Sequence, residues 1–174
     1  VLERGTGAVR LIDSRFLPMG TGIVTAPDGK RFAFNSAGST ILQEFLSEKP
    51  PLTLAPRTSA GSVQPVAFTP DGRSMALLTT GNQIAVFDTV AGKLRRSFAV
   101  TGSGGRPGQF VLSHTGRWLA IISPSNRGVD IHDFATGELR YTLPDREGTV
   151  YWLAWHPKEP RLAIARDNGA IAIW

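Results

Sequence analysis

The segment "VAFTPDGRSMALLTTGNQIAVFDTVAGKLRRSFAV", Val66 to Val100, decides the fold because the chain repeats it. It aligns almost element by element with "FVLSHTGRWLAIISPSNRGVDIHDFATGELRYTL", Phe110 to Leu143, and its first part aligns with "LAWHPKEPRLAIARDNGAIAIW", Leu153 to Trp174. A fainter copy is "IVTAPDGKRFAFNSAGSTILQEF", Ile23 to Phe45. Equivalent turn positions lie 43, 44 and 42 residues apart: Pro27, Pro70, His114 and His156. Four periods of about 43 residues therefore fill the 174-residue chain.

Each period has the pattern of short β-strands joined by tight turns. "SMALL" (74–78) and "WLAII" (118–122) are short apolar runs, and "IAVFD" (84–88) and "VDIHD" (129–133) alternate as half-buried strands do. In "PDGK" and "PDGR" a glycine allows positive φ, and Asp28 or Asp71 can bond its own backbone two residues on. Sustained helical periodicity is absent, so we expect little or no helix.

The units predict an all-β fold built from four-stranded sheets. Along the chain each unit has an outer strand, an inner strand and then two more, which gives blades over residues 9–45, 52–88, 94–133 and 139–174, with 1–8 as the tail of a preceding blade. A lone sheet of this kind cannot cover both of its apolar faces. Face-to-face packing of successive units around an axis does so and leaves only short edges. We therefore expect one β-propeller domain over residues 1–174.

The chain resembles the WD40-like repeats of bacterial proteins over essentially its whole length. The best-matching motifs are "FTPDGR" (68–73), "NQIAVFDTVAGKL" (82–94), "VDIHDFATGEL" (129–139) and "DNGAIAIW" (167–174). The closing aromatic–Asp pair of that family stands here as Phe87–Asp88 and His132–Asp133, and as Trp174 in the last unit. The Gly-His dipeptide of typical WD repeats is absent from every unit, so the hydrogen-bonded tetrad built on that histidine is not expected.

The resemblance also bears on the number of blades. WD-like propellers usually close with seven or eight blades, which implies that four blades form half of a ring. By repeat phase, Val1 and Leu2 align with the end of a third strand, and Trp174 falls at the phase of Leu2. We expect the ring to be completed by neighbouring blades of a longer chain or by a second copy in a homodimer. A closed four-bladed ring is the alternative.

Composition excludes several kinds of chemistry. The chain has no cysteine, so it has neither a disulfide nor a thiolate site. Its apolar runs are too short for a transmembrane helix, and we expect no membrane association. No signal-peptide pattern stands at the N-terminus, which slightly favours the cytoplasm and leaves the periplasm open. The net charge of +5 is scattered rather than clustered, and a GC-rich coding bias toward arginine would also produce it.

The residues that could do chemistry form no recognisable catalytic or metal-binding set. His114 and His156 share one repeat phase, but a metal ion would need a further ligand there. We therefore expect no metal site. His132 stands where the family has tryptophan and is expected to pack against the next blade. No "GxSxG" elbow accompanies the serines and histidines. "TGSGGRPG" (101–108) lacks the ending and the helix of a phosphate loop, so no cofactor is expected.

One rim of the predicted propeller collects arginines. The loops from outer to inner strands and from second to third strands emerge on the same rim, and they carry Arg57, Arg106, Arg127, Arg146 and Arg166. Arginine presents a planar fork to carboxylates and is frequent at binding hot spots. These residues are the predicted partner-binding site, although loops in an arginine-rich protein would carry arginines in any case. Trp118, Trp152 and Trp155 are expected in the core or between blades.

These patterns favour a non-catalytic scaffold that binds a protein or peptide, preferably an acidic one, through its rim loops. Fold alone does not dictate this function. One alternative is the propeller domain of an enzyme such as a dehydrogenase, a lactonase or a peptidase-associated protein, but the rim loops supply mainly Arg, Gly and Ser. Another is nucleic-acid binding, which the charge suggests but which lacks aromatic side chains interleaved with basic ones. We therefore expect no catalysis and no nucleic-acid partner.

Overall fold

A computed structural model describes residues 23–36, 38–45, 47, 49–55, 64–79, 83–100, 109–123 and 126–174. Within them the chain forms four antiparallel sheets and no helix, and so none that could span a membrane. The first sheet contains β1 (Val24–Thr25), β2 (Arg31–Ser36), β3 (Ser39–Glu44) and β4 (Leu52–Ala55). The second contains β5 (Gln64–Phe68), β6 (Ser74–Thr79), β7 (Gln83–Asp88) and β8 (Leu94–Ala99). The third contains β9 (Phe110–Leu112), β10 (Trp118–Ile122), β11 (Gly128–Asp133) and β12 (Leu139–Pro144), and the fourth contains β13 (Val150–Trp155), β14 (Leu162–Arg166) and β15 (Ile171–Ile173).

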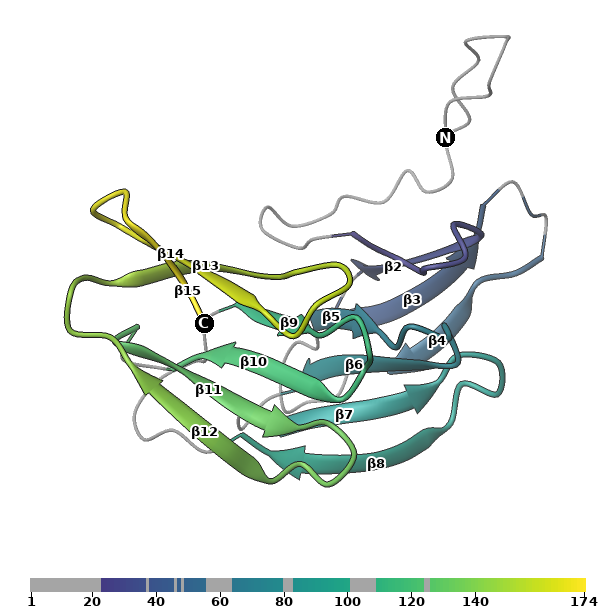
Figure 1. Ribbon diagram of the computed structural model, residues 1–174. Helices are drawn as coiled ribbons and strands as arrows, with labels where there is room; N and C mark the ends of the chain where they lie inside the picture. The colour runs from purple at the N-terminus through teal and green to yellow at the C-terminus, as the bar shows by residue number, and fades with distance from the viewer. Residues whose placement is uncertain are drawn as a thin grey trace, which may run out of the picture.

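The sheets follow one another around a common axis as the blades of a propeller (Figure 1). The all-β class, the propeller and the four repeats are therefore confirmed. The predicted blade bounds differ from the sheets in one respect: each outer strand closes the sheet that precedes it, because β4 pairs with β3, β8 with β7 and β12 with β11. The reason is the short turn after each third strand, such as Asp88–Gly92, which returns the chain directly along its neighbour. The segments 1–8 and 9–14 lie outside the described residues.

The turns between inner and second strands have the predicted chemistry. The Asp28 carboxylate accepts a hydrogen bond from the Lys30 N–H at 2.9 Å, and the Asp71 carboxylate accepts one from the Arg73 N–H at 3.0 Å. The turn glycine has positive φ in three successive sheets: 66° at Gly29, 66° at Gly72 and 72° at Gly116. Repeated side-chain-to-backbone bonds and glycines thus set the same turn three times.

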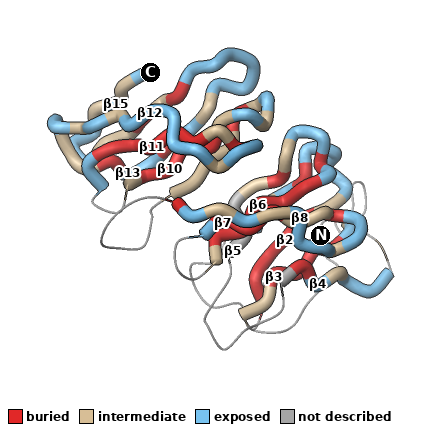
Figure 2. Tube along the Cα trace, turned by 90° about the horizontal axis from the view of Figure 1, so that it is seen from below, coloured by how far each residue is buried: buried red, intermediate tan, exposed pale blue. Residues whose placement is uncertain are grey.

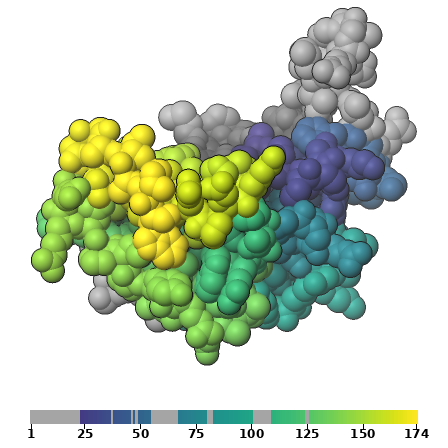
Figure 3. Space-filling model, in the orientation of Figure 1, coloured from purple at the N-terminus to yellow at the C-terminus, as the bar shows by residue number. Residues whose placement is uncertain are grey.

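Successive sheets pack face to face, and the core consists of three junctions. One cluster joins sheets 1 and 2, a second joins sheets 2 and 3, and a third joins sheets 3 and 4. Figure 2 shows the buried residues running along the middle strands of the sheets, while β15 and much of β12 are exposed or intermediate. Figure 3 shows the fourth sheet, in yellow, lying on the third, in green. No buried cluster among the described residues joins the fourth sheet to the first.

Each junction packs a small residue against a pair of large ones. An alanine in the second strand of sheets 1, 2 and 3 is fully buried and faces the following sheet: Ala33, Ala76 and Ala120. The following sheet meets it with two large apolar side chains two residues apart: Met75 and Leu77, then Leu119 and Ile121, then Leu162 and Ile164. Small residues on one face let the large ones of the next sheet approach closely.

The fourth sheet keeps this pattern on a face that no other described sheet covers. Its equivalent alanine is Ala163, in register with Ala154 and Ile173, and the next row is Trp152, Ala165 and Ile171. Trp152, Ile171 and Ile173 are 59%, 69% and 66% exposed. Trp152 therefore does not lie in the core of the described residues, since a bulge between Val150 and Trp152 leaves its indole on the open face, and its place between blades stays a prediction. Completion of the ring by further blades or a second copy stays a prediction.

Two equivalent turn glycines test which turns touch the neighbouring sheet. A Cβ at Gly116 would meet the Pro70 Cδ at 2.8 Å, whereas a Cβ at Gly29 has nothing within 4 Å. Both substitutions to alanine lose stability because an L-residue at positive φ costs about 1–2 kcal/mol. We expect Gly116→Ala to lower Tm clearly further than Gly29→Ala, as measured by thermal circular dichroism. Equal losses would show that the Gly116 turn does not pack on Pro70.

The open face of the fourth sheet predicts self-association. Exposed apolar sheet faces promote aggregation or assembly. We expect Ile171→Lys combined with Ile173→Lys to reduce the solution mass or the aggregation seen by light scattering while leaving Tm nearly unchanged. Ile164→Lys, on the opposite and buried face of the same sheet, is the matched control and should prevent folding. A parent chain that is already a stable monomer would contradict the expected completion of the ring.

Candidate functional site

The rim loops beside sheets 3 and 4 bring three of the five predicted arginines together around Asp145. The backbone N–H of Asp145 donates to the carbonyl of Arg127 at 2.9 Å, and Arg146 follows Asp145 in the chain. The Arg166 Nε lies 2.7 Å from the Asp145 Oδ2. Arg57 and Arg106 lie outside the described residues. The prediction that these loops share one rim therefore agrees with the placement of Arg127, Arg146 and Arg166.

Arg166 has a structural role in this rim. Besides Asp145 it contacts Glu147, with its Nη1 3.0 Å from the Glu147 Oε2. The side chains of Arg166 and Asp145 are only 11% and 7% exposed, so this ion pair is shielded from solvent. Asn168 donates from its side chain to the Glu147 carbonyl at 2.9 Å, which ties the last hairpin of the chain to the loop before β13. Arg166 and Asn168 thus join the end of β14 and the turn after it to the loop before β13.

Electrostatics in these loops follow from the same contacts. The hydrogen bond from the Arg166 guanidinium lowers the pKa of Asp145 below its usual value, and the bond to Asp145 raises the pKa of Arg166. The backbone N–H of Thr149 donates to the Asp167 carboxylate at 3.0 Å and lowers the pKa of Asp167. Both carboxylates are therefore ionised near neutral pH and balance part of the positive charge of the rim.

Of the three described arginines at this rim, Arg127 and Arg146 are exposed. Both adjoin Asp145, whose backbone N–H donates to the Arg127 carbonyl and whose carboxylate accepts the Glu147 N–H at 3.0 Å, while Arg146 follows it in the chain. The loops that carry them are thus held by backbone and side-chain bonds rather than by the arginine side chains alone. A guanidinium on a fixed loop loses less conformational entropy when it binds a carboxylate.

Two of the three histidines, His132 and His156, occupy different environments. His156 is exposed, and its Nδ1 accepts the backbone N–H of Glu159 at 2.9 Å, so this nitrogen caps a turn. His132 is fully buried and its Nδ1 lies 3.1 Å from the Gly137 carbonyl. Within the described ranges, no group of three or more His, Asp or Glu side chains is arranged to hold a metal ion.

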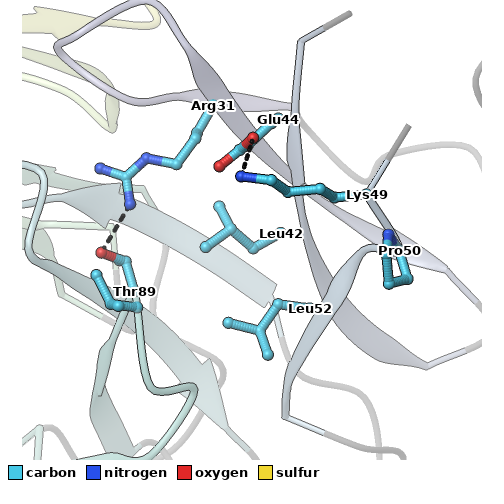
Figure 4. A pocket seen from close by; sticks show the side chains of 8 residues that line it. Arg31, Leu42, Glu44, Lys49, Pro50, Leu52 and Thr89 are labelled. Atoms are coloured by element: carbon cyan, nitrogen blue, oxygen red, sulfur yellow. Dashed lines mark hydrogen bonds and ion pairs between the residues drawn. The ribbon is translucent and has the colours of Figure 1, made fainter. Parts of the chain in front are cut away.

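The opposite end of the propeller holds a pocket that the sequence pattern did not suggest. It has a volume of about 250 Å³ at the junction of sheets 1 and 2, and it is lined by Arg31, Leu42, Glu44, Lys49, Pro50, Leu52, Thr89 and Val90 (Figure 4). The Arg31 Nη1 donates to the Thr89 hydroxyl at 3.0 Å, and the Lys49 Nζ lies 3.6 Å from the Glu44 Oε2. Leu42 and Leu52 form its apolar floor.

Aromatic rings continue the junction of sheets 3 and 4 toward the surface. The Trp155 indole donates to the Val111 carbonyl at 3.1 Å across the junction, and its ring centroid lies 6.3 Å from that of Trp174. Trp174 in turn lies 5.7 Å from Tyr141, which lies 6.1 Å from Trp118. The expectation that Trp118 and Trp155 lie between blades is confirmed, and Trp174 joins them.

Comparison with solved structures agrees with this geometry. The chain superposes on the β-propeller domain of Cps50 (Swd1) from Myceliophteria thermophila with a TM-score of 0.70 and 19% identity, over 88% of this chain and 52% of that one. The fold is that of a β-propeller. The WD40-type resemblance of the sequence is therefore confirmed at the level of the fold, and the chain spans about half the length of the propeller it matches. No protein-family model and no curated protein matches the chain.

The Arg166 ion pair gives a prediction on stability and pH. Because the pKa of Asp145 is lowered in the folded state, its stabilising contribution is present above the ordinary carboxyl pKa of 3.8 and is lost as the pH falls through the lower, folded-state value. We expect Arg166→Gln to lower Tm at pH 7 and to lower it much less at pH 2.5, measured by calorimetry. Arg146→Gln, on the loop that carries Asp145, is the matched control and should leave Tm unchanged at both pH values. An equal loss at both pH values for Arg166→Gln would contradict the pairing.

Proposed function

We propose that this WD40-type propeller is a non-catalytic interaction module that binds an acidic protein or peptide segment at the rim carrying Arg127 and Arg146. The observation that carries the proposal is the arrangement around Asp145, where two exposed arginines stand on loops fixed by hydrogen bonds. A rigid scaffold with polar loops at one end suits recognition of an extended partner. Arg57 and Arg106 belong to the same predicted rim and are part of the proposal.

Two features of the described residues support binding rather than catalysis. The carboxylates at this rim pair with Arg166 or accept backbone N–H groups: Asp145, Glu147 and Asp167. Such pairs orient loops, whereas a general acid or base needs a group whose pKa is tuned toward the working pH. The pKa values of the two rim carboxylates Asp145 and Asp167 are lowered instead, away from neutral pH.

The arginine rim can be tested with a labelled hexaglutamate peptide as the acidic probe. We expect Arg127→Ala combined with Arg146→Ala to weaken its binding about 2- to 30-fold, since each exposed ion pair contributes roughly 0.2–1 kcal/mol. Fluorescence anisotropy measures the affinity, and circular dichroism checks that the variant is folded.

Lys93→Ala combined with Lys158→Ala is the matched control, because it removes the same charge from exposed positions at the opposite end. This variant should bind the peptide as the parent does. Equal weakening by both double variants would show that the peptide responds only to the net charge of the protein. That result would exclude the rim as a specific binding site. Tighter binding of single-stranded DNA of matched charge, with a steep salt dependence, would favour the nucleic-acid alternative.

A further inference from the structure

The first residue of the turn after each third strand differs among the sheets. This position is Phe45 in sheet 1, Thr89 in sheet 2 and Phe134 in sheet 3. Phe134 is buried in the cluster between sheets 2 and 3. Its ring centroid lies 6.4 Å from that of Phe98, and the Arg96 guanidinium carbon lies 4.8 Å from the Phe134 centroid. At this junction two rings and a cation fill the end of the interface.

The junction of sheets 1 and 2 has smaller side chains at the corresponding places. Thr89 replaces the phenylalanine, and its hydroxyl donates to the Gly72 carbonyl at 2.7 Å and accepts from Arg31. The turn glycine Gly92 lies against Leu52, whereas its equivalent Gly137 lies against the ring of Phe98. A threonine and a leucine therefore stand where the next junction has two phenylalanines. The 250 Å³ pocket occupies this end of the interface.

We propose that this pocket binds an aromatic side chain of a partner peptide, which takes the place that Phe134 takes at the next junction. Its volume is below the roughly 300–1,000 Å³ of sites for drug-sized ligands, and it suits a single large side chain. Leu42, Leu52 and Val90 offer apolar contacts, and Figure 4 shows the two leucines pointing into the space between Thr89 and the Glu44–Lys49 pair.

The polar residues of the pocket suit the rest of such a peptide. Arg31 brings a guanidinium to the pocket, as Arg96 does to the rings at the next junction, and cations over aromatic faces add to binding. Lys49 and Glu44 are 78% and 47% exposed and can exchange their mutual contact for peptide backbone groups. The site rests on the proposed role as an interaction module, but it lies at the end opposite the arginine rim and shares no residue with it.

Binding can be measured by NMR titration of the full chain with N-acetyl-phenylalanine amide and N-acetyl-tryptophan amide. We expect saturable shifts at Leu42, Leu52, Thr89 and Val90, and none with N-acetyl-alanine amide. Thr89→Phe fills the pocket from within and should weaken binding at least about tenfold. Thr89→Val has nearly the shape of threonine and leaves the space open, so it should bind within about twofold of the parent.

The outcomes separate this site from the rim. If Thr89→Phe fails to fold, Leu52→Phe fills the same space from the other sheet and takes its place. The double variant Arg127→Ala, Arg146→Ala should keep the aromatic amide titration unchanged, so loss of the rim function and loss of the pocket are distinguishable. Equal shifts with the alanine amide, unaltered binding by the pocket-filling variants, or no saturable binding would each overturn the proposal.

Discussion

The packing of one small residue against two large ones at each sheet junction is the constraint on which this structure depends. A four-stranded sheet with two apolar faces is not stable by itself, and burial of each large side chain contributes roughly 1.5–3 kcal/mol. Ala33, Ala76 and Ala120 leave room for the pair presented by the next sheet. Stability therefore resides in contacts between neighbours, and the order of sheets along the chain becomes their order in space.

Much of the fold can be predicted from the sequence because the determinants are local and repeated. Alternation of apolar residues places the strands, and turn glycines and aspartates such as Gly72 and Asp71 place the turns. That alternation does not predict which neighbouring strand each outer strand pairs with. It depends on connection length, since β8 begins six residues after β7 ends while β9 begins eleven residues after β8 ends. The face occupied by Trp152 depends on a bulge, which a period of two does not reveal.

The candidate sites differ in how far the sequence could show them. Loop position alone places Arg127, Arg146 and Arg166 on one rim, but which arginine is bound internally depends on residues 21 positions apart meeting in space, as Arg166 and Asp145 do. The pocket was detectable in principle. Aligning the repeats shows a threonine at 89 between phenylalanines at 45 and 134. A size difference at one repeat position becomes informative only once that position is known to face a neighbouring sheet.

Both candidate sites lie at the ends of the sheets, and the junctions explain why. The middle of each interface is filled by side chains from central strands, such as Leu119 against Ala76, and has no room for a change in volume without a cost in stability. At the strand ends the turns carry side chains that are not needed to align one sheet on the next. Thr89 can therefore stand in place of a phenylalanine while its hydroxyl still bridges Arg31 and the Gly72 carbonyl. A scaffold of this kind separates stability from recognition, so each junction can differ at its ends without altering the blade.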